Sequence, residues 1–232
     1  MRCATALTLV IILASASAAR LSAQVCDAFP SLREGRVRVS ADLASYTYAT
    51  ALGVTLGAGK DLNAAVAVGR TRDSDLDASA LDVRFALAAD IPFSAARRVF
   101  LCPLAAYTMT FGPNDYLLTR QDYRYRDLAL GLGFGVVAVR IPGLAVLLTA
   151  GFRESRLTTV RTDWPTVVNA YGLWTLGVGL AFDGVLTVRP SVSIPVGFVR
   201  PGQRTDYAVP FGREEGEASL GVSIGINFGK RH

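Results

Sequence analysis

The chemistry open to this sequence is limited by its histidines. The chain of 232 residues has one histidine, His232, and it is the last residue. Hydrolases and acyltransferases that use a histidine beside Ser or Asp need its imidazole fixed in place, because it takes up and returns a proton near neutral pH. The end of a chain does not hold a side chain in that way, and a histidine-based metal site is disfavoured for the same reason. We therefore expect a non-enzymatic protein with no catalytic residues, no cofactor and no metal ion.

Seven charged residues are placed so that they would share an enclosed space. They fall in alternating stretches, on the face opposite the apolar side chains, and they are Arg38, Asp42, Asp82, Arg84, Asp90, Arg153 and Arg189. One interpretation is a charged constriction that selects solutes. The other is a network of ion pairs that fills a narrow interior. The mixed signs favour the network.

Cysteine is the other residue type that could react. Cys3 lies in the N-terminal leader considered below, which leaves Cys26 and Cys102. An even pair in an oxidising compartment is typical of a disulfide. We predict a bond between these two residues that ties the segment before the first strand to the mouth of the fold. Two free buried thiols are the alternative.

Aromatic and arginine side chains, which are common in recognition surfaces, gather in long polar segments. The candidates for an interaction there are Tyr116, Arg120, Tyr123, Arg124, Tyr125 and Trp164. Arginines at the border of these segments could also pair with the phosphate groups of lipopolysaccharide. Solvated loops without a specific partner are the alternative interpretation.

The elements that position all these residues are β-strands. In the stretch 218–229 large apolar residues alternate with Gly, Ser and Asn, and such a period of two is typical of a strand. The run Gly131-x-Gly133-x-Gly135 has the same period, so it belongs to a strand rather than to a phosphate-binding loop. The alternation predicts strands at 36–47, 49–60, 64–73, 79–91, 99–111, 126–140, 144–158, 170–182, 185–199 and 218–229.

The composition favours a barrel over helical membrane spans. The chain is 51% hydrophobic with a mean hydropathy of +0.34, yet after the leader it has no run of about 18 apolar residues, the length a membrane helix needs. A closed barrel is then the remaining way to pair the backbone polar groups inside a membrane. We predict an all-β, closed antiparallel up-and-down transmembrane barrel of about ten strands. Eight strands are the fallback, because the connection at 47–48 is unusually short.

The N-terminus indicates export. Arg2 precedes an apolar run and then small residues, which is typical of a secretory signal peptide, here cleaved after Ala23. We therefore divide the chain into a signal peptide (1–23), a periplasmic lead-in (24–35) and the barrel (36–229). Loss of Arg2 and Arg20 with the leader lowers the formal net charge from +5 to +3, which is too mild to indicate nucleic acid as a partner.

Aromatic residues sort toward the two ends of the predicted strands, as the interfacial girdles of a membrane barrel would. The residues expected at the outer rim are Tyr46, Tyr107, Phe111, Phe152, Tyr171, Trp174 and Phe198, and those at the periplasmic rim are Phe93, Phe100, Phe182 and Phe228.

With its signal peptide, its repeated alternation and its closing sequence GVSIGINFG, the chain resembles the OmpA-like and OmpW-like single-domain barrels of outer membranes. The resemblance covers most of residues 36–229, although family members commonly end on an aromatic residue and Phe228 is followed by Gly-Lys-Arg-His. It implies a place in the outer membrane of a Gram-negative bacterium, among lipid and lipopolysaccharide. We expect a monomer with a structural role or a surface interaction with an extracellular partner. The alternative is a narrow porin-like channel for small solutes.

Overall fold

The computed structural model describes residues 37–45, 49–59, 62–73, 78–93, 98–112, 124–160, 167–183, 185–196 and 218–228. The predicted signal peptide and lead-in lie outside these residues, and so does Cys26. Within the ranges just given, no helix is long and apolar enough to cross a membrane.

The described residues form strands and the connections between them. The path of β4 is interrupted at Asp90 and continues in the short β5, and both segments pair with β6, so the two form one wall. The fold therefore has ten walls, close to the bounds that the alternation predicts. The strands are β1 (Val37–Ser45), β2 (Ala49–Gly59), β3 (Leu62–Asp73), β4 (Ala78–Ala89), β5 (Ile91–Pro92), β6 (Val99–Phe111), β7 (Arg124–Ile141), β8 (Leu144–Val160), β9 (Val167–Phe182), β10 (Leu186–Val196) and β11 (Ser219–Phe228).

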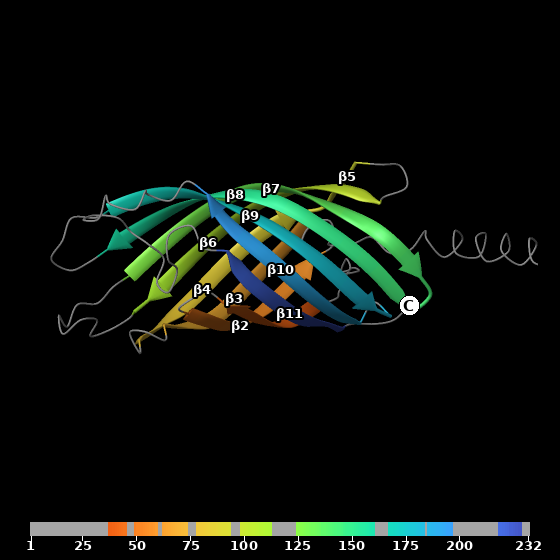
Figure 1. Cartoon of the computed structure of the whole chain (residues 1–232), viewed down its shortest axis with the longest axis horizontal. Coiled ribbons are helices and arrows are strands. Elements are labelled where there is room, and N and C mark those ends of the chain that lie inside the picture. The colour runs from red at the N-terminus through yellow and green to blue at the C-terminus, as the bar shows by residue number, and fades with distance from the viewer. Residues whose placement is uncertain are drawn as a thin grey trace, which may run out of the picture.

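The strand pairing is antiparallel throughout and closes on itself. The order runs from β4 through β3, β2, β1, β11, β10, β9, β8 and β7 to β6, and β6 pairs back with β4. β1 and β11 meet from Val37 opposite Phe228 to Ser45 opposite Leu220. Figure 1 shows the strands winding obliquely around one long barrel. The closed ten-strand barrel is confirmed, and the fallback of eight strands is wrong because β1 and β2 are separate, paired strands.

The two ends of the barrel differ in their connections. At what we call the short-turn end, the chain turns through residues 60–61, 93–98, 142–143 and 183–185. At the opposite, long-loop end, it passes through 46–48, 74–77, 112–123, 161–166 and 197–218. The turn after β2 requires glycine, because Gly59 has a φ of 128° and a Cβ there would stand 2.0 Å from the carbonyl oxygen of Leu62.

The prolines of β10 argue against a regular strand, yet the strand is present. Its register with β9 is the same on both sides of Pro190, from Val188 opposite Leu180 to Ser191 opposite Gly177, while the residues between are not paired with β9. Proline has no N–H to donate to the ladder. Pro190 therefore interrupts one ladder without shifting the strand.

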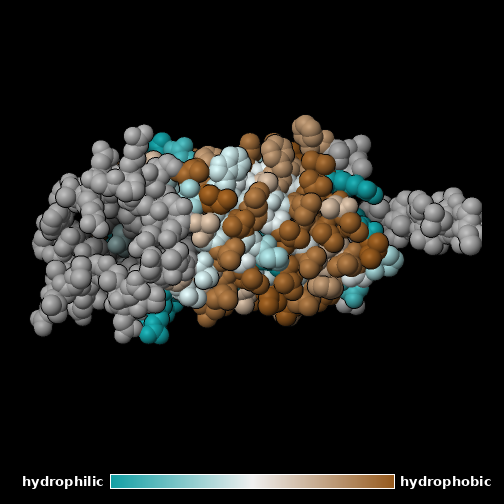
Figure 2. Space-filling model, viewed as in Figure 1, coloured by the Kyte–Doolittle hydropathy of each residue, from teal (hydrophilic) through white to brown (hydrophobic). Residues whose placement is uncertain are grey.

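The outward faces of the strands form an apolar belt. Leu52, Leu130 and Leu220, on three different strands, are 63%, 60% and 66% exposed. In Figure 2 hydrophobic residues form a band across the barrel, with hydrophilic patches toward its two edges. Monomeric soluble proteins rarely expose apolar patches of this extent, whereas a lipid-facing barrel wall requires one. The apolar face of the alternation is therefore the outer face, as predicted.

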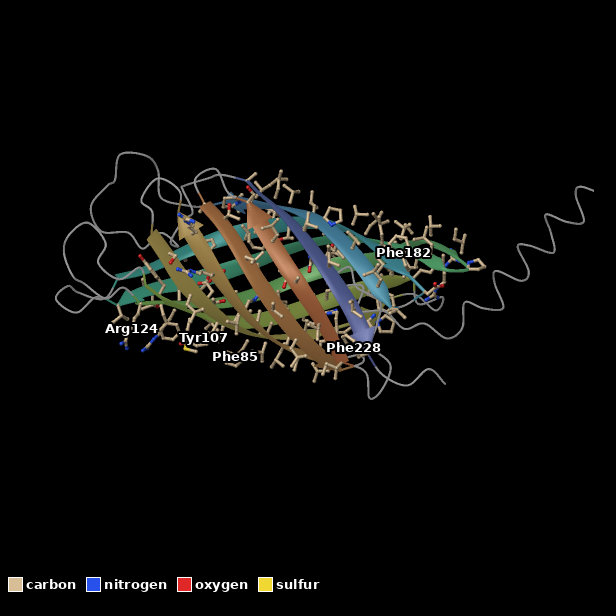
Figure 3. All side chains as sticks on the ribbon, turned by 90° about the horizontal axis from the view of Figure 1, so that it is seen from below. Phe85, Tyr107, Arg124, Phe182 and Phe228 are labelled. Atoms are coloured by element: carbon tan, nitrogen blue, oxygen red, sulfur yellow. The ribbon has the colours of Figure 1, made fainter. Side chains whose placement is uncertain are left out.

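Several of the described aromatic residues lie on the outside near the two rims. Phe111 does so at the long-loop end, where β6 ends, and Phe182 and Phe228 do so at the short-turn end, where Figure 3 labels them. Phe152 and Trp174 are exposed near the middle of β8 and β9. The rings of Phe152 and Trp174 stand 5.0 Å apart, centroid to centroid.

The girdle prediction is wrong for two residues that point inward. Tyr171 and Phe100 are each 3% exposed. The hydroxyl of Tyr171 donates a hydrogen bond to Asp127 inside the barrel, and Phe100 packs in a buried cluster with Cys102 and Leu147. Tyr46 and Phe198 lie outside the described residues.

Candidate functional site

The barrel encloses a cavity of about 390 Å³ that is lined by residues from all ten walls. Its lining combines charged and hydroxyl-bearing residues with small and apolar ones. Asp42, Thr55 and Ser191 line it from β1, β2 and β10, while Gly69 and Gly221 line it from β3 and β11. The strand alternation thus places the polar and small face around an interior space.

Three carboxylates of the cavity are held by hydroxyl groups from other strands. Asp42 accepts hydrogen bonds from Thr55 Oγ1, at 2.6 Å, and from Ser223 Oγ. Because Thr55 and Ser223 lie on the two strands beside β1, the carboxylate is held from both sides.

Asp82, on β4, is held in the same way by hydroxyl groups from its two neighbouring strands, β3 and β6. Its two carboxylate oxygens accept hydrogen bonds from Thr71 Oγ1, at 2.9 Å, and from Thr110 Oγ1, at 2.5 Å. Asp127 accepts one from Tyr171 Oη at 3.1 Å. Hydrogen bonds to a charged acceptor are stronger than neutral ones. The hydroxyls therefore hold these carboxylates in place against the neighbouring strands.

Arginines share the cavity with these carboxylates. Besides Arg70, which is exposed on the outward face of β3, four arginines line it, so the inward-facing charged groups are nearly balanced: Arg38, Arg84, Arg153 and Arg189 with Asp42, Asp82 and Asp127. A balanced lining does not concentrate ions of one sign. This composition is unlike the single-sign rings that select ions in channels.

The structure brings together the seven charged residues predicted to face inward. Six of them line the cavity, and Asp90, which is 3% exposed, is buried at the break between β4 and β5. An ion-pair network among them stays a prediction, because the hydrogen bonds of Asp42 and Asp82 given above go to hydroxyl groups.

At the short-turn end the inward-facing residues are buried. Each of the ten walls contributes an inward-facing residue that is buried, and we call this ring the short-turn seal. Its exposed fractions include 0% for Thr187, 1% for Leu147 and 8% for Asn227. Its members are Arg38, Gly57, Asn63, Asp90, Phe100, Val137, Leu147, Ala181, Thr187 and Asn227.

The seal has an apolar part and a polar part. Phe100, Val137 and Leu147, on β6, β7 and β8, pack together with Cys102. On the opposite part of the ring the Arg38 guanidinium lies over Gly57, where an added Cβ would stand 3.3 Å from Nη2. Gly57 therefore provides room for a buried arginine that a larger residue would crowd. The cavity is thus open above a packed layer of side chains.

Several lumen residues were not anticipated from the sequence. Asp127 shares the inward parity of Ala129 and Gly131, so the alternation alone could have placed it. Tyr125 was expected in an external loop, but it lies in β7, lines the cavity and packs against Leu157.

The remaining loop candidates divide between the described and undescribed parts of the chain. Arg124 also lies in β7, where it is exposed on the outside of the barrel. Tyr116, Arg120, Tyr123 and Trp164 lie outside the described residues. Within the described ranges, no three His, Cys, Asp or Glu side chains come together in a way that could hold a metal ion.

Among known proteins, similarity to this chain is found in solved structures. No protein-family model matches the sequence, and no curated protein matches it significantly. The translocator domain of the autotransporter NalP from Neisseria meningitidis is 14% identical, with a TM-score of 0.48 over 84% of this chain and 88% of that one. Neisserial surface protein A is 9% identical, with a TM-score of 0.41 over 83% and 93%.

The N-terminal β-barrel domain of Pseudomonas aeruginosa OprF is 15% identical, with a TM-score of 0.33 over 83% of this chain and 97% of that one. Likenesses at this level carry no argument about function. The architecture follows from the strand pairing itself, which closes ten antiparallel strands with the apolar face outward. The chain therefore has the fold of the small outer-membrane β-barrels that its sequence resembles.

Proposed function

We propose that the protein is a non-conducting barrel of the outer membrane, with a structural or surface-interaction role and no enzymatic activity. The observation that carries the proposal is the short-turn seal, in which every wall of the barrel buries an inward-facing residue. A conducting pore needs a continuous water-filled path, and a small barrel has a lumen only about wide enough for its own side chains. We expect the buried residues of the seal to fill that width across one end.

The alternative is a narrow channel for small solutes, and the cavity of about 390 Å³ favours it. A channel would need the seal to open. Conductance of the purified protein in planar bilayers separates the two functions. We expect no stable current from the wild type, and a stable ohmic current in the wild type would overturn the proposal.

A variant with an opened seal shows whether the absence of current in the wild type is due to the seal. Phe100→Ala with Leu147→Ala removes two buried side chains from the apolar part of the seal. We expect this double variant to pass current while the wild type does not. Heat-dependent gel migration of the variant shows whether its barrel has closed. A folded double variant that is also silent would place the block elsewhere in the chain and contradict the proposed role of the seal.

The outer-membrane placement is part of the same proposal and rests on the apolar belt. It includes export through the signal peptide (1–23), a monomeric barrel surrounded by lipid and lipopolysaccharide, and no nucleic-acid partner. Membrane fractionation of a Gram-negative host tests the placement. Recovery in the outer-membrane fraction supports it, and recovery in the soluble periplasmic fraction contradicts it.

A disulfide between Cys26 and Cys102 would attach the lead-in to the sealed end. Cys102 is 5% exposed and packs beside Phe100 and Leu147. A bond at this position would hold residues 24–35 against the short-turn end. Mass measurement after alkylation without reductant tests it: we expect no label, and label on both cysteines would exclude the bond.

A further inference from the structure

The outward-facing charges of the described strands are concentrated at the long-loop end. Elsewhere the outward faces of these strands are apolar or small, as on β1, β10 and β11. The charges at the long-loop end are predominantly positive, and all of them are exposed: Arg70, Arg72, Arg124, Arg126, Glu154 and Arg156. The lipid-facing wall therefore ends in a mostly basic border on this side.

Three of these side chains form a cluster on β7 and β8, which we call the rim arginines: Arg124, Arg126 and Arg156. In the ladder, Arg126 is opposite Thr158 and Leu128 is opposite Arg156. Arg126 and Arg156 are therefore diagonal neighbours, about 7 Å apart. Arg124 lies two residues before Arg126 and shares its face. The cluster places three positive charges on one patch of the outer surface.

Among the residues that the structure describes, one carboxylate forms an ion pair with this cluster. Glu154 Oε1 lies 3.7 Å from Arg156 Nε, and the two side chains are 57% and 71% exposed. An ion pair this exposed contributes little free energy. By contrast, Arg70 on β3 donates a hydrogen bond to Ser79 Oγ at 2.7 Å. The excess positive charge of the rim arginines is thus available to an external anion.

The wall directly below the rim arginines is apolar. Leu128, Leu130 and Leu132 follow them along the outward face of β7 and are 48%, 60% and 51% exposed. Tyr107 lies opposite Leu128. In Figure 3, Tyr107 and Arg124 point away from the barrel along one side, with Arg124 nearer the long-loop end. An occupant of this surface needs anionic groups at the level of the arginines and apolar chains along the leucines.

We propose that the rim arginines bind the phosphate groups of a phosphorylated, acylated glycolipid in the outer leaflet. The planar guanidinium matches the oxygens of a phosphate with two parallel hydrogen bonds, and arginine is more weakly hydrated than lysine. Acyl chains then lie along the leucines below. This inference rests on the proposed placement in the outer membrane, with the long-loop end facing outward.

The test measures binding of diphosphorylated lipid A to the full mature protein in detergent, by native mass spectrometry. We expect Arg124→Gln with Arg126→Gln and Arg156→Gln to lose about tenfold or more in affinity, because each lost charged hydrogen bond weakens binding severalfold. Lipid A without its phosphates is expected to bind the wild type as weakly as diphosphorylated lipid A binds the triple glutamine variant. The corresponding triple lysine variant is expected to bind with intermediate affinity, since it keeps the charge and loses the paired hydrogen bonds.

A control variant separates the cluster from total charge. Arg70→Gln with Arg72→Gln and Arg98→Gln removes the same number of charges from other exposed positions and is expected to keep most of the affinity. Equal losses in both triple variants, wild-type affinity in the cluster variant, or equal binding of dephosphorylated lipid A would each overturn the inference. The protein could pass no current and be recovered in the outer membrane, yet bind no lipid A. That result would leave the proposed function standing and refute only the lipid A site.

Discussion

The inward faces of the same ten strands are built differently at the two ends of the barrel. At the short-turn end they are packed, as the exposed fractions of 0% for Thr187 and 1% for Leu147 show. Nearer the long-loop end they are mixed: Asp42, Asp82 and Ser191 are half-buried around the cavity, whereas Leu157 and Tyr171 are buried beside it. Along β10 the change occurs between Thr187 and Ser191.

The difference shows that inward-facing residues of one barrel can be packed or can border a cavity. In the open part, carboxylates are held by hydroxyls and remain next to an interior space. In the sealed part, apolar and polar side chains together exclude that space. Substitutions of the same kind should therefore have different effects in the two parts.

The largest difference is expected for leucine. Leu147→Ala in the seal should cost about 3 kcal/mol of unfolding free energy, because it leaves a cavity in a packed layer. Leu104→Ala, whose side chain is half-buried and lines the open cavity, should cost about 1 kcal/mol, since space already exists beside it. Urea unfolding of both variants in lipid vesicles, followed by tryptophan fluorescence, measures the two values. Equal losses would mean that the two parts are packed alike.

Aspartate gives the next comparison. Asp90→Ala should cost about 2 kcal/mol, because a carboxylate that is 3% exposed leaves buried neighbours without their partner. Asp82→Ala should cost about 1 kcal/mol, because Thr71 and Thr110 can turn to water in the cavity. The same unfolding experiment applies. A larger loss for Asp82 than for Asp90 would contradict the distinction between a dry and a wet part.

Glycine gives the smallest expected effect. A Cβ at Gly177 would stand 2.8 Å from Thr149 Oγ1, whereas the nearest atom to a Cβ at Gly151 would be Gly133 Cα, at 3.6 Å. Gly177→Ala should therefore destabilise the barrel by about 1 kcal/mol, and Gly151→Ala should be nearly neutral. Thermal gel-shift assays can rank the two variants. Equal destabilisation by the two variants would contradict the difference in space beside the two glycines.

The barrel could be predicted from the sequence because its signal is repeated. Alternation with a period of two sets the face of each side chain, so residues such as Arg38 and Asp82 were placed inward correctly. Strand ends were less certain, since polar residues continue across them. Arg124 and Tyr125 were assigned to a loop for that reason, although both belong to β7.

The seal was not predictable, and β6 shows why. Both faces of this strand are apolar near Cys102, so parity could not tell whether Phe100 faces lipid or lumen. An inward-facing residue is packed against other side chains or borders the cavity according to the residues that neighbouring strands place beside it. Pairing across the barrel, such as Tyr171 with Asp127, 44 residues apart, is set by register and not by local pattern.

The most direct test of the sealed end compares two positions on one strand. In a background with Cys26→Ser and Cys102→Ser, single cysteines are introduced as Ser191→Cys in the open part and Thr187→Cys in the seal. Intact cells are then treated with a membrane-impermeant maleimide, and the labelling rates are measured. We predict that the cysteine at position 191 reacts at least about tenfold faster, because position 187 is fully buried and buried thiols are inert. Similar rates at the two positions would contradict the seal.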